Sequence, residues 1–126
     1  MNKEFIPYEQ ALELKELGFD EPCFGSYVKL TETQNTFFMN DVVSEIDRET
    51  PLHESLITKA PLYQQAFRWF REKYSLFGQV NIHTYFIYDI SNDELKMVKQ
   101  YDKLTKTYEE AELACLIELI EIIKKK

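Results

Sequence analysis

Apolar residues recur at intervals of three and four in three stretches of the chain, which is the spacing of an amphipathic helix. The first stretch lies between Pro7 and Gly18, the second begins at Pro61, and the third begins at Thr107. Proline suits the first turn because its missing amide has no partner there. Glycine suits the left-handed residue that ends a helix, and Thr107 with Glu110 matches the S/T-x-x-E capping box. The pattern predicts three helices.

Alternation of side chains predicts two hairpins. Residues 80–90 form the clearest strand, and residues 95–101 return as its partner after the turn-forming segment 91–94. Residues 26–30 and 36–39 form a shorter pair. In the long strand, Val80, Ile82, Thr84, Phe86, Tyr88 and Ile90 share one side, and the more polar side carries Asn81, His83, Tyr85, Ile87 and Asp89.

Residues 41–60 have the least regular pattern, with acidic and apolar positions interspersed. We expect one short helix over residues 42–46, followed by a loop that contains Pro51. Because loops longer than about 12–15 residues are uncommon in compact domains, a loop here is expected to be mobile or functional.

These elements give the order α-ββ-α-ββ-α. At 126 residues the chain fits one domain, residues 1–126. We therefore predict a single α+β domain in which helices pack on one antiparallel sheet of about four strands.

The three predicted helices share a Tyr-x-x-Ala motif, which begins at Tyr8, Tyr63 and Tyr108. Duplication of an α-ββ unit is one explanation, since repeats of about 50 residues occur. Convergence on favourable first-turn chemistry is the other. The motif is expected at different distances from each helix start, so we favour convergence.

The last helix is apolar over most of its circumference. Two adjacent stripes consist of Leu113, Leu116, Ile117, Ile120 and Ile123, and of Tyr108, Cys115, Leu119 and Ile122. A sheet face covers about one stripe, so the other needs a second helix or a second chain. We expect the first helix to supply most of this cover, with a homodimer as the alternative.

Charge limits the classes of partner. The chain has 15 basic and 22 acidic residues, a net charge of −7. Nucleic acids and anionic membranes require clustered positive charge, so a broad basic surface is excluded while a local basic patch is not. No apolar run reaches the roughly 18 residues of a membrane span, and no signal-peptide pattern is present. We expect a cytoplasmic protein.

Cysteine and histidine are scarce and widely spaced. Cys23 and Cys115 are expected to form no disulfide, because a secreted disulfide scaffold has more cysteines. Together with His53 and His83 they show no short ligand spacing of the kind found in zinc sites. We therefore expect no metal ion and no cofactor.

Common catalytic and nucleotide-binding motifs are missing: there is no G-x-x-x-x-G-K-[ST], G-x-G-x-x-G, H-E-x-x-H or G-x-S-x-G. His83 is the best single candidate for a general base, on the more polar side of the long strand beside Tyr85. A half-exposed strand histidine without catalytic function is the simpler interpretation.

The polar side of the second helix is the candidate partner-binding site. Gln64, Arg68 and Arg71 are spaced to project from one face, with Trp69 at its rim. Arginine and tryptophan are enriched among residues that dominate protein interfaces. They also stack on bases and contact phosphates. The acidic net charge favours a protein partner over nucleic acid. The competing interpretation is structural, with Trp69 packed on the sheet.

Two segments, residues 61–74 (PLYQQAFRWFREKY) and 107–116 (TYEEAELACL), together with residues 8–23, resemble small uncharacterised proteins of Bacteroidales-type bacteria and their phages. The resemblance covers about half of the chain. It implies a bacterial or prophage setting in the cytoplasm and transfers no reaction and no catalytic residue.

The sequence thus favours a non-enzymatic protein-interaction or accessory protein, acting as a monomer or homodimer. A nucleic-acid-binding accessory protein is the second hypothesis, and a small enzyme using His83 is the third.

Overall fold

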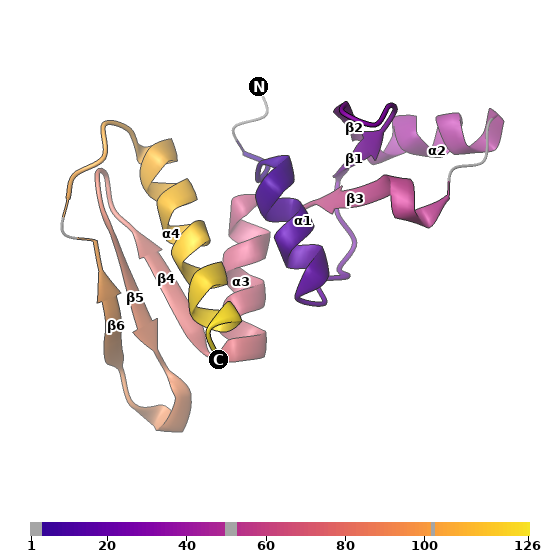
Figure 1. The fold of residues 1–126 in the computed structure, drawn as a ribbon. Coiled ribbons are helices and arrows are strands. Elements are labelled where there is room, and N and C mark those ends of the chain that lie inside the picture. Colours follow the sequence, from indigo (N-terminus) through magenta and orange to yellow (C-terminus); the bar gives the residue numbers. More distant parts are fainter. Residues whose placement is uncertain (1–3, 50–52, 102) are drawn as a thin grey trace. The chain divides into compact units, whose positions relative to one another are not determined.

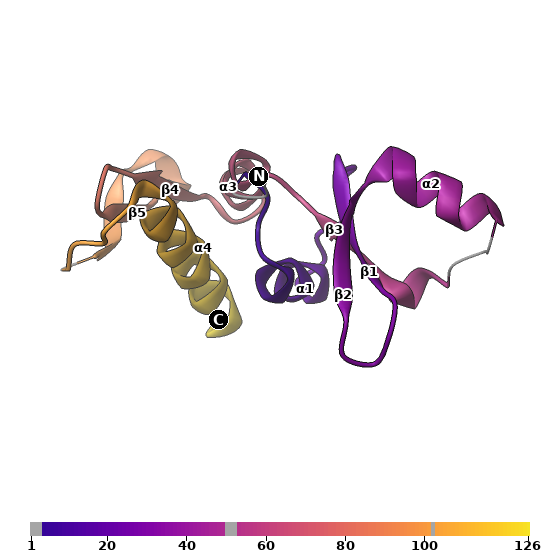
Figure 2. The same ribbon diagram turned by 90° about the horizontal axis from the view of Figure 1, so that it is seen from above.

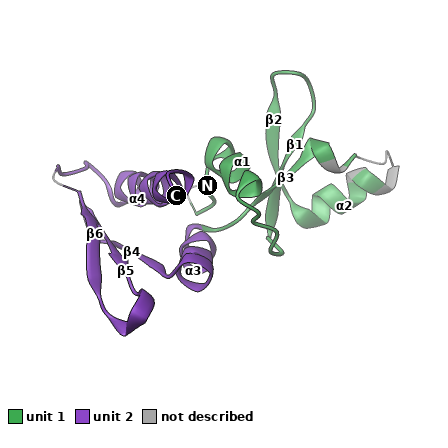
Figure 3. Cartoon of the chain, turned by 60° about the horizontal axis from the view of Figure 1, so that its bottom comes forward, with its two compact units in different colours: residues 1–62 green, residues 63–126 purple. Residues whose placement is uncertain are grey.

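Helices and antiparallel strands follow one another in the computed structural model, which describes residues 4–49, 53–101 and 103–126. The chain divides into two compact units, residues 1–62 and 63–126 (Figure 3). The predicted α+β class is confirmed, but the predicted sheet and element order are wrong. The described residues form two three-stranded antiparallel sheets and four helices, in place of one sheet of about four strands.

Unit 1 contains α1 (Tyr8–Glu16), β1 (Gly25–Lys29), β2 (Asn35–Met39), α2 (Asn40–Glu49), the short 3-10 helix η1 (Glu54–Leu56) and β3 (Ile57–Ala60) (Figure 1). Its sheet has the order β2-β1-β3, with both pairs antiparallel. The helices α1 and α2 lie on opposite faces of this sheet (Figure 2). The β1–β2 pair confirms the first predicted hairpin.

The start and the end of unit 1 meet each other. Phe5 forms an antiparallel bridge with Leu62, and the Ile6 amide donates to the Pro61 carbonyl at 3.0 Å. Ile6 is fully buried, and its own carbonyl accepts a 2.8 Å hydrogen bond from the Tyr27 hydroxyl of the central strand. Unit 1 is therefore closed by backbone pairing between its two ends.

The first helix ends as predicted. Gly18 has a φ of 100°, a left-handed conformation that a side chain disfavours. The Phe19 amide donates to the Leu14 carbonyl at 2.9 Å, and the Gly18 amide donates to Lys15. This is the bonding of a Schellman cap. The buried Phe19 ring then begins the return of the chain toward the sheet.

The interpretation of residues 41–60 is wrong in two respects. The helix is longer than predicted, Asn40–Glu49, and β3 follows where a loop was expected. Pro51 lies outside the described residues. In β3 the buried positions are Thr58 and Ala60, while Ile57 and Lys59 are partly exposed. A polar and a small residue face the core, so the strand lacks the usual apolar alternation.

Unit 2 contains α3 (Tyr63–Tyr74), β4 (Leu76–Val80), β5 (Tyr85–Asp89), the short helix η2 (Ser91–Asp93), β6 (Lys96–Gln100) and α4 (Tyr108–Lys124) (Figure 1). The sheet is an antiparallel meander of order β4-β5-β6. Both helices pack on β4, α4 also packs on β5, and α3 contacts α4.

The predicted strand over residues 80–90 is two strands joined by a turn. Ser75 has a φ of 58°, which ends α3 and lets β4 begin at Leu76. The Asn81 amide then donates to the Thr84 carbonyl at 2.8 Å and closes the turn before β5. Alternation continued by chance through the turn residues, so the sequence pattern concealed the break.

Gly78 shows that α3 and α4 cover the same face of this sheet. A Cβ atom at Gly78 would lie 3.0 Å from the Cys115 sulfur and 3.2 Å from Leu119, both on α4, and 3.7 Å from Phe67 on α3. The glycine thus lets both helices approach the middle of β4. Leu76 and Ile87, on the same side of their strands as Gly78, are also buried. We call this the helix-covered face.

The buried side of α4 lies between the two predicted stripes. It consists of Ala111, Cys115, Leu116, Leu119 and Ile120. Ile117 and Tyr108, which were assigned to the stripes, are exposed. The predicted cap is present, since the Thr107 hydroxyl accepts from the Glu110 amide at 3.1 Å, but the Glu110 carboxylate accepts from Lys106 rather than Thr107. Within unit 2, α3 covers part of α4. Cover by the first helix stays a prediction.

Candidate functional site

The residues predicted as a binding site on the second helix differ in their exposure. Gln64 and Arg68 are exposed on α3, as expected, but Trp69 is only 6% exposed. Its ring packs edge-on against Phe70 at 5.2 Å and Tyr74 at 5.5 Å, between ring centroids. The indole is therefore buried beside aromatic residues of its own helix, and its packing on the sheet stays a prediction.

Arg71 is directed toward the sheet. Its guanidinium lies 5.3 Å from the centroid of the Phe77 ring, within range of a cation–π interaction. Phe77 belongs to β4 and points away from the helix-covered face, because its neighbours Leu76 and Gly78 point toward it. The structure thus places the Arg71 guanidinium beside an aromatic residue of the opposite sheet face.

His83 lies in the turn between β4 and β5, not in the middle of a strand. Its residue is exposed, and its backbone carbonyl accepts hydrogen bonds from the amide and the hydroxyl of Thr105. Across the described residues, no three or more His, Cys, Asp or Glu side chains are grouped so as to hold a metal ion. The contact of His83 with the neighbouring loop is therefore made by its backbone carbonyl and not by its imidazole.

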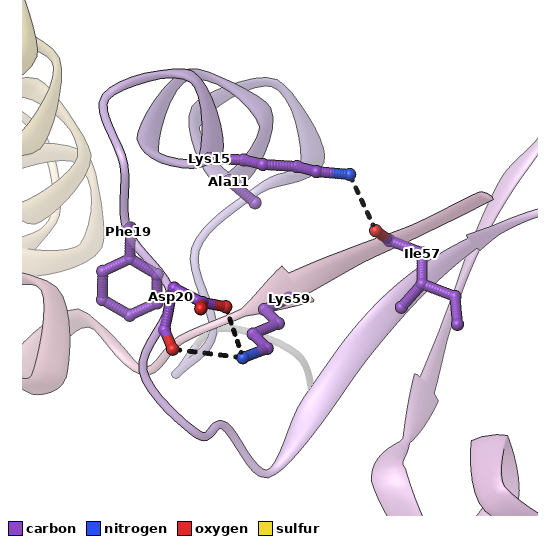
Figure 4. A pocket seen from close by; sticks show the side chains of 6 residues that line it. All are labelled: Ala11, Lys15, Phe19, Asp20, Ile57 and Lys59. Atoms are coloured by element: carbon purple, nitrogen blue, oxygen red, sulfur yellow. Dashed lines mark hydrogen bonds and ion pairs between the residues drawn. The ribbon is translucent and has the colours of Figure 1, made fainter. Parts of the chain in front are cut away.

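Unit 1 has a pocket of about 260 Å³ between α1 and β3. Figure 4 shows Lys15 reaching from α1 toward the Ile57 carbonyl, and Lys59 reaching from β3 toward Asp20. The first hydrogen bond measures 3.1 Å. Lys59 donates to the Asp20 carboxylate at 2.9 Å and to the Asp20 carbonyl at 3.2 Å.

The polar groups of this pocket are engaged with the protein itself. Lys59 is paired with a carboxylate, and both lysines hold backbone carbonyls of neighbouring segments. Ala11 and Phe19 supply a buried apolar floor. The arrangement ties the turn after α1 to β3, so we interpret the pocket as a structural junction.

The uncovered face of the unit 2 sheet carries a row of large side chains. Phe77 pairs with Tyr88, and Tyr88 pairs with Met97, so the three lie side by side across β4, β5 and β6. A second row consists of Gln79, Phe86 and Gln100. The Phe86 and Tyr88 rings are stacked, with 6.4 Å between centroids. We call these six residues the outer face.

The outer face corrects the prediction for the long strand. The side with Phe86 and Tyr88 had the stronger apolar pattern, yet the buried residues of β5 are Tyr85 and Ile87, from the side predicted to be more polar. Sequence reasoning therefore missed this surface because its aromatic residues looked like core residues. One signal was available: the side of β5 with Phe86 and Tyr88 also carries a glutamine in each neighbouring strand, Gln79 and Gln100.

The strand β6 forms an exposed edge beside the outer face. All five of its residues are exposed, and Met97 is 48% exposed. Lysine occurs at 96, 99, 103 and 106, and the exposed apolar residues nearby are Leu95, Val98 and Leu104. The register shifts between Ile87 and Tyr88, so Val98 is the extra residue of a β-bulge. We call residues 95–100 the β6 edge.

Charge is divided unevenly between the units. Residues 1–62 contain 5 basic and 12 acidic residues, whereas residues 63–126 contain 10 of each. The net charge of −7 therefore belongs to unit 1, and unit 2 is neutral with its own basic segment at residues 95–106. The net negative charge of the whole chain is therefore no guide to the local charge around β6, where lysines predominate.

Comparison with protein families, curated proteins and solved structures found no match for this chain. The resemblance to small bacterial and phage proteins stays a prediction. No helix among the described residues is long and apolar enough to cross a membrane.

Proposed function

We propose that this chain is a non-enzymatic accessory protein that binds another protein through the outer face of unit 2. The observation that carries the proposal is the cross-strand row of Phe77, Tyr88 and Met97 on the sheet face opposite α3 and α4. A sheet face with apolar side chains normally packs against another layer. In unit 2 the helices occupy the other face, so a partner is the natural second layer.

The chemistry of the outer face suits a protein partner. Aromatic residues, methionine and arginine are enriched at protein interfaces, and Arg71 lies against one end of the row at Phe77. Gln79 and Gln100 flank the row with neutral hydrogen-bonding groups. The rings are already ordered by stacking on each other, so binding orders few additional side chains.

Nucleic acid is the second candidate, favoured by the four lysines of residues 95–106 beside an aromatic sheet face. The equal numbers of acidic and basic residues in unit 2 give it less support. A salt titration separates the two candidates, because binding to phosphates weakens steeply as salt concentration rises.

The test uses position 97. A photo-reactive phenylalanine replacing Met97 is expected to cross-link to a partner protein in extracts of the source cells, and one replacing Leu30 is not. Leu30 is a matched control, since it is about equally exposed (51%) and lies in unit 1. The purified partner should bind Met97→Thr about tenfold more weakly than the unsubstituted chain, the effect of losing one good interface contact.

Leu30→Thr should leave the affinity unchanged. Equal affinity of the Met97→Thr variant, with its melting temperature retained, would contradict the proposal. So would exclusive cross-linking to nucleic acid.

A further inference from the structure

An edge strand presents every second backbone N–H and C=O group away from its neighbour, ready to pair with another strand. In unit 2, β6 is paired with β5 on one side, and no described strand of this unit lies on its other side. Its five residues are all exposed. The β6 edge therefore has the backbone groups needed to accept a further strand.

Lysines and β-bulges commonly protect such edges against pairing, and β6 has both. Protection does not require exposed apolar side chains, yet Leu95 is 70% exposed and Met97 and Val98 are exposed as well. Exposed apolar groups favour association. The combination indicates an edge that disfavours basic strands and accepts a strand of opposite, acidic charge.

We propose that the β6 edge binds an extended segment of a partner protein by strand addition, and that this segment alternates acidic and apolar residues. This inference rests on the proposed function and names its partner chemistry. The acidic side chains would face Lys96 and Lys99, which lie across from Asp89 and Ile87 of β5. The apolar side chains would extend the row of Phe77, Tyr88 and Met97 by one more strand.

A second copy of this chain does not fit the edge. Two β6 strands side by side would bring lysines together, which is unfavourable between strands. Among the six described strands, Asp89 in the central strand β5 is the only acidic residue. None of the described strands is therefore an acidic edge strand, so we assign the acidic segment to a different protein.

The test uses the full chain and a synthetic probe, an eight-residue peptide of alternating glutamate and valine. Binding is expected to shift the NMR signals of residues 95–100 and to slow hydrogen exchange of outward-directed β6 amides. The double variant Lys96→Glu with Lys99→Glu should bind this peptide at least about tenfold more weakly. It should bind a lysine–valine peptide more tightly than the unsubstituted chain does.

Lys124→Glu with Lys125→Glu is the matched control, because it changes the charge of unit 2 equally at residues outside β6. Equal loss in this control would show unspecific attraction and overturn the inference, as would binding without protection of β6 amides. Displacement of the peptide by an oligothymidine of 15 nucleotides would assign the lysines to nucleic acid instead.

The natural partner found through position 97 distinguishes this inference from the proposed function. One outcome is that this partner binds the Lys96→Glu, Lys99→Glu variant with normal affinity and the Met97→Thr variant only weakly. In that case strand addition at β6 is wrong, and the outer face is still the binding surface. If both variants bind it normally, the proposed function is wrong as well.

Discussion

Alanine occupies the fourth position of three helices, and each of these alanines is fully buried. Ala11, Ala66 and Ala111 stand three residues after Tyr8, Tyr63 and Tyr108, each the first residue of its helix. The expected difference in distance from the helix start is therefore wrong. Burial at the fourth position explains the motif without duplication, because a small side chain lets the first turn approach its neighbour closely. The different strand orders of the two units also give duplication no support.

Cys115 is the residue for which the fold most strongly changes an ionisation. Burial, reinforced by the nearby Glu118 and Glu112, raises the pKa of its thiol to about 12. In the unfolded chain the thiol titrates near its ordinary value of about 8.5. The native state therefore holds a proton that the unfolded state loses between these two values.

This difference predicts a loss of stability in alkali. The thiol's contribution to the free energy of unfolding is fully present below about pH 8.5. Above about pH 8.5, the free energy of unfolding should fall by about 1.4 kcal/mol for each further pH unit. Urea denaturation of the unsubstituted chain and of Cys115→Ala at pH 7, 9 and 10.5 measures the effect. Burial raises the pKa values of Tyr27 and Tyr108; Tyr27 acts equally in both proteins, whereas Cys115 itself contributes to the shift of Tyr108. Parallel pH dependence of the two would contradict the prediction.

The helices were predictable because their signals are local. Pro7, Gly18 and Thr107 lie at or next to the helix ends that the sequence indicated, and side-chain spacing fixed the rest. The sheets were harder. Whether Phe86 or Ile87 faces the core depends on where α3 and α4 lie, and alternation alone leaves that choice open. The same applies to β3. Its residue Thr58 is buried because of the strand and the side chains that lie beside it in the sheet, which the sequence alone does not show.

The candidate site was predictable only in part. Arg71 was predicted on a partner-binding face with Trp69 at its rim, whereas its guanidinium lies against Phe77 and the indole of Trp69 is buried. That contact depends on the abrupt turn at Ser75, which brings β4 back beside α3. A left-handed serine has no clear signature in a single sequence.

The buried stripe of α4 gives a prediction with an internal control. Ile120 is 1% exposed and Ile117, on the same helix, is 40% exposed. Ile120→Asp should unfold unit 2, because an unpaired buried charge costs several kcal/mol. Ile117→Asp should change the melting temperature little. Tryptophan fluorescence and near-UV circular dichroism report the outcome, and a folded Ile120→Asp variant would show that this stripe lies outside the core.

The uneven charge of the whole chain predicts different responses to salt. Unit 1 has an excess of seven acidic residues and is destabilised by their mutual repulsion, which salt screens, whereas unit 2 is balanced. The single tryptophan, Trp69, lies in unit 2, so its fluorescence reports that unit alone. Raising sodium chloride from 20 to 300 mM should raise the unfolding midpoint of unit 1 by several degrees and leave the tryptophan transition nearly unchanged.

Amide NMR signals of residues 25–39 provide the readout for unit 1 in the same samples. An equal shift of both transitions would mean that the two units unfold together. A shift confined to the tryptophan transition would mean that charge balance does not set the salt response.

The bridge between Phe5 and Leu62 has a consequence for the chain's connectivity. Because the two ends of unit 1 are hydrogen-bonded neighbours, a short Gly-Ser segment can join residue 62 to residue 4 without stretching the backbone. The chain can then be opened in the exposed turn at residues 31–34, between β1 and β2. Unit 1 is thus suited to circular permutation, and equally to insertion as a cassette into a surface loop of an unrelated host protein.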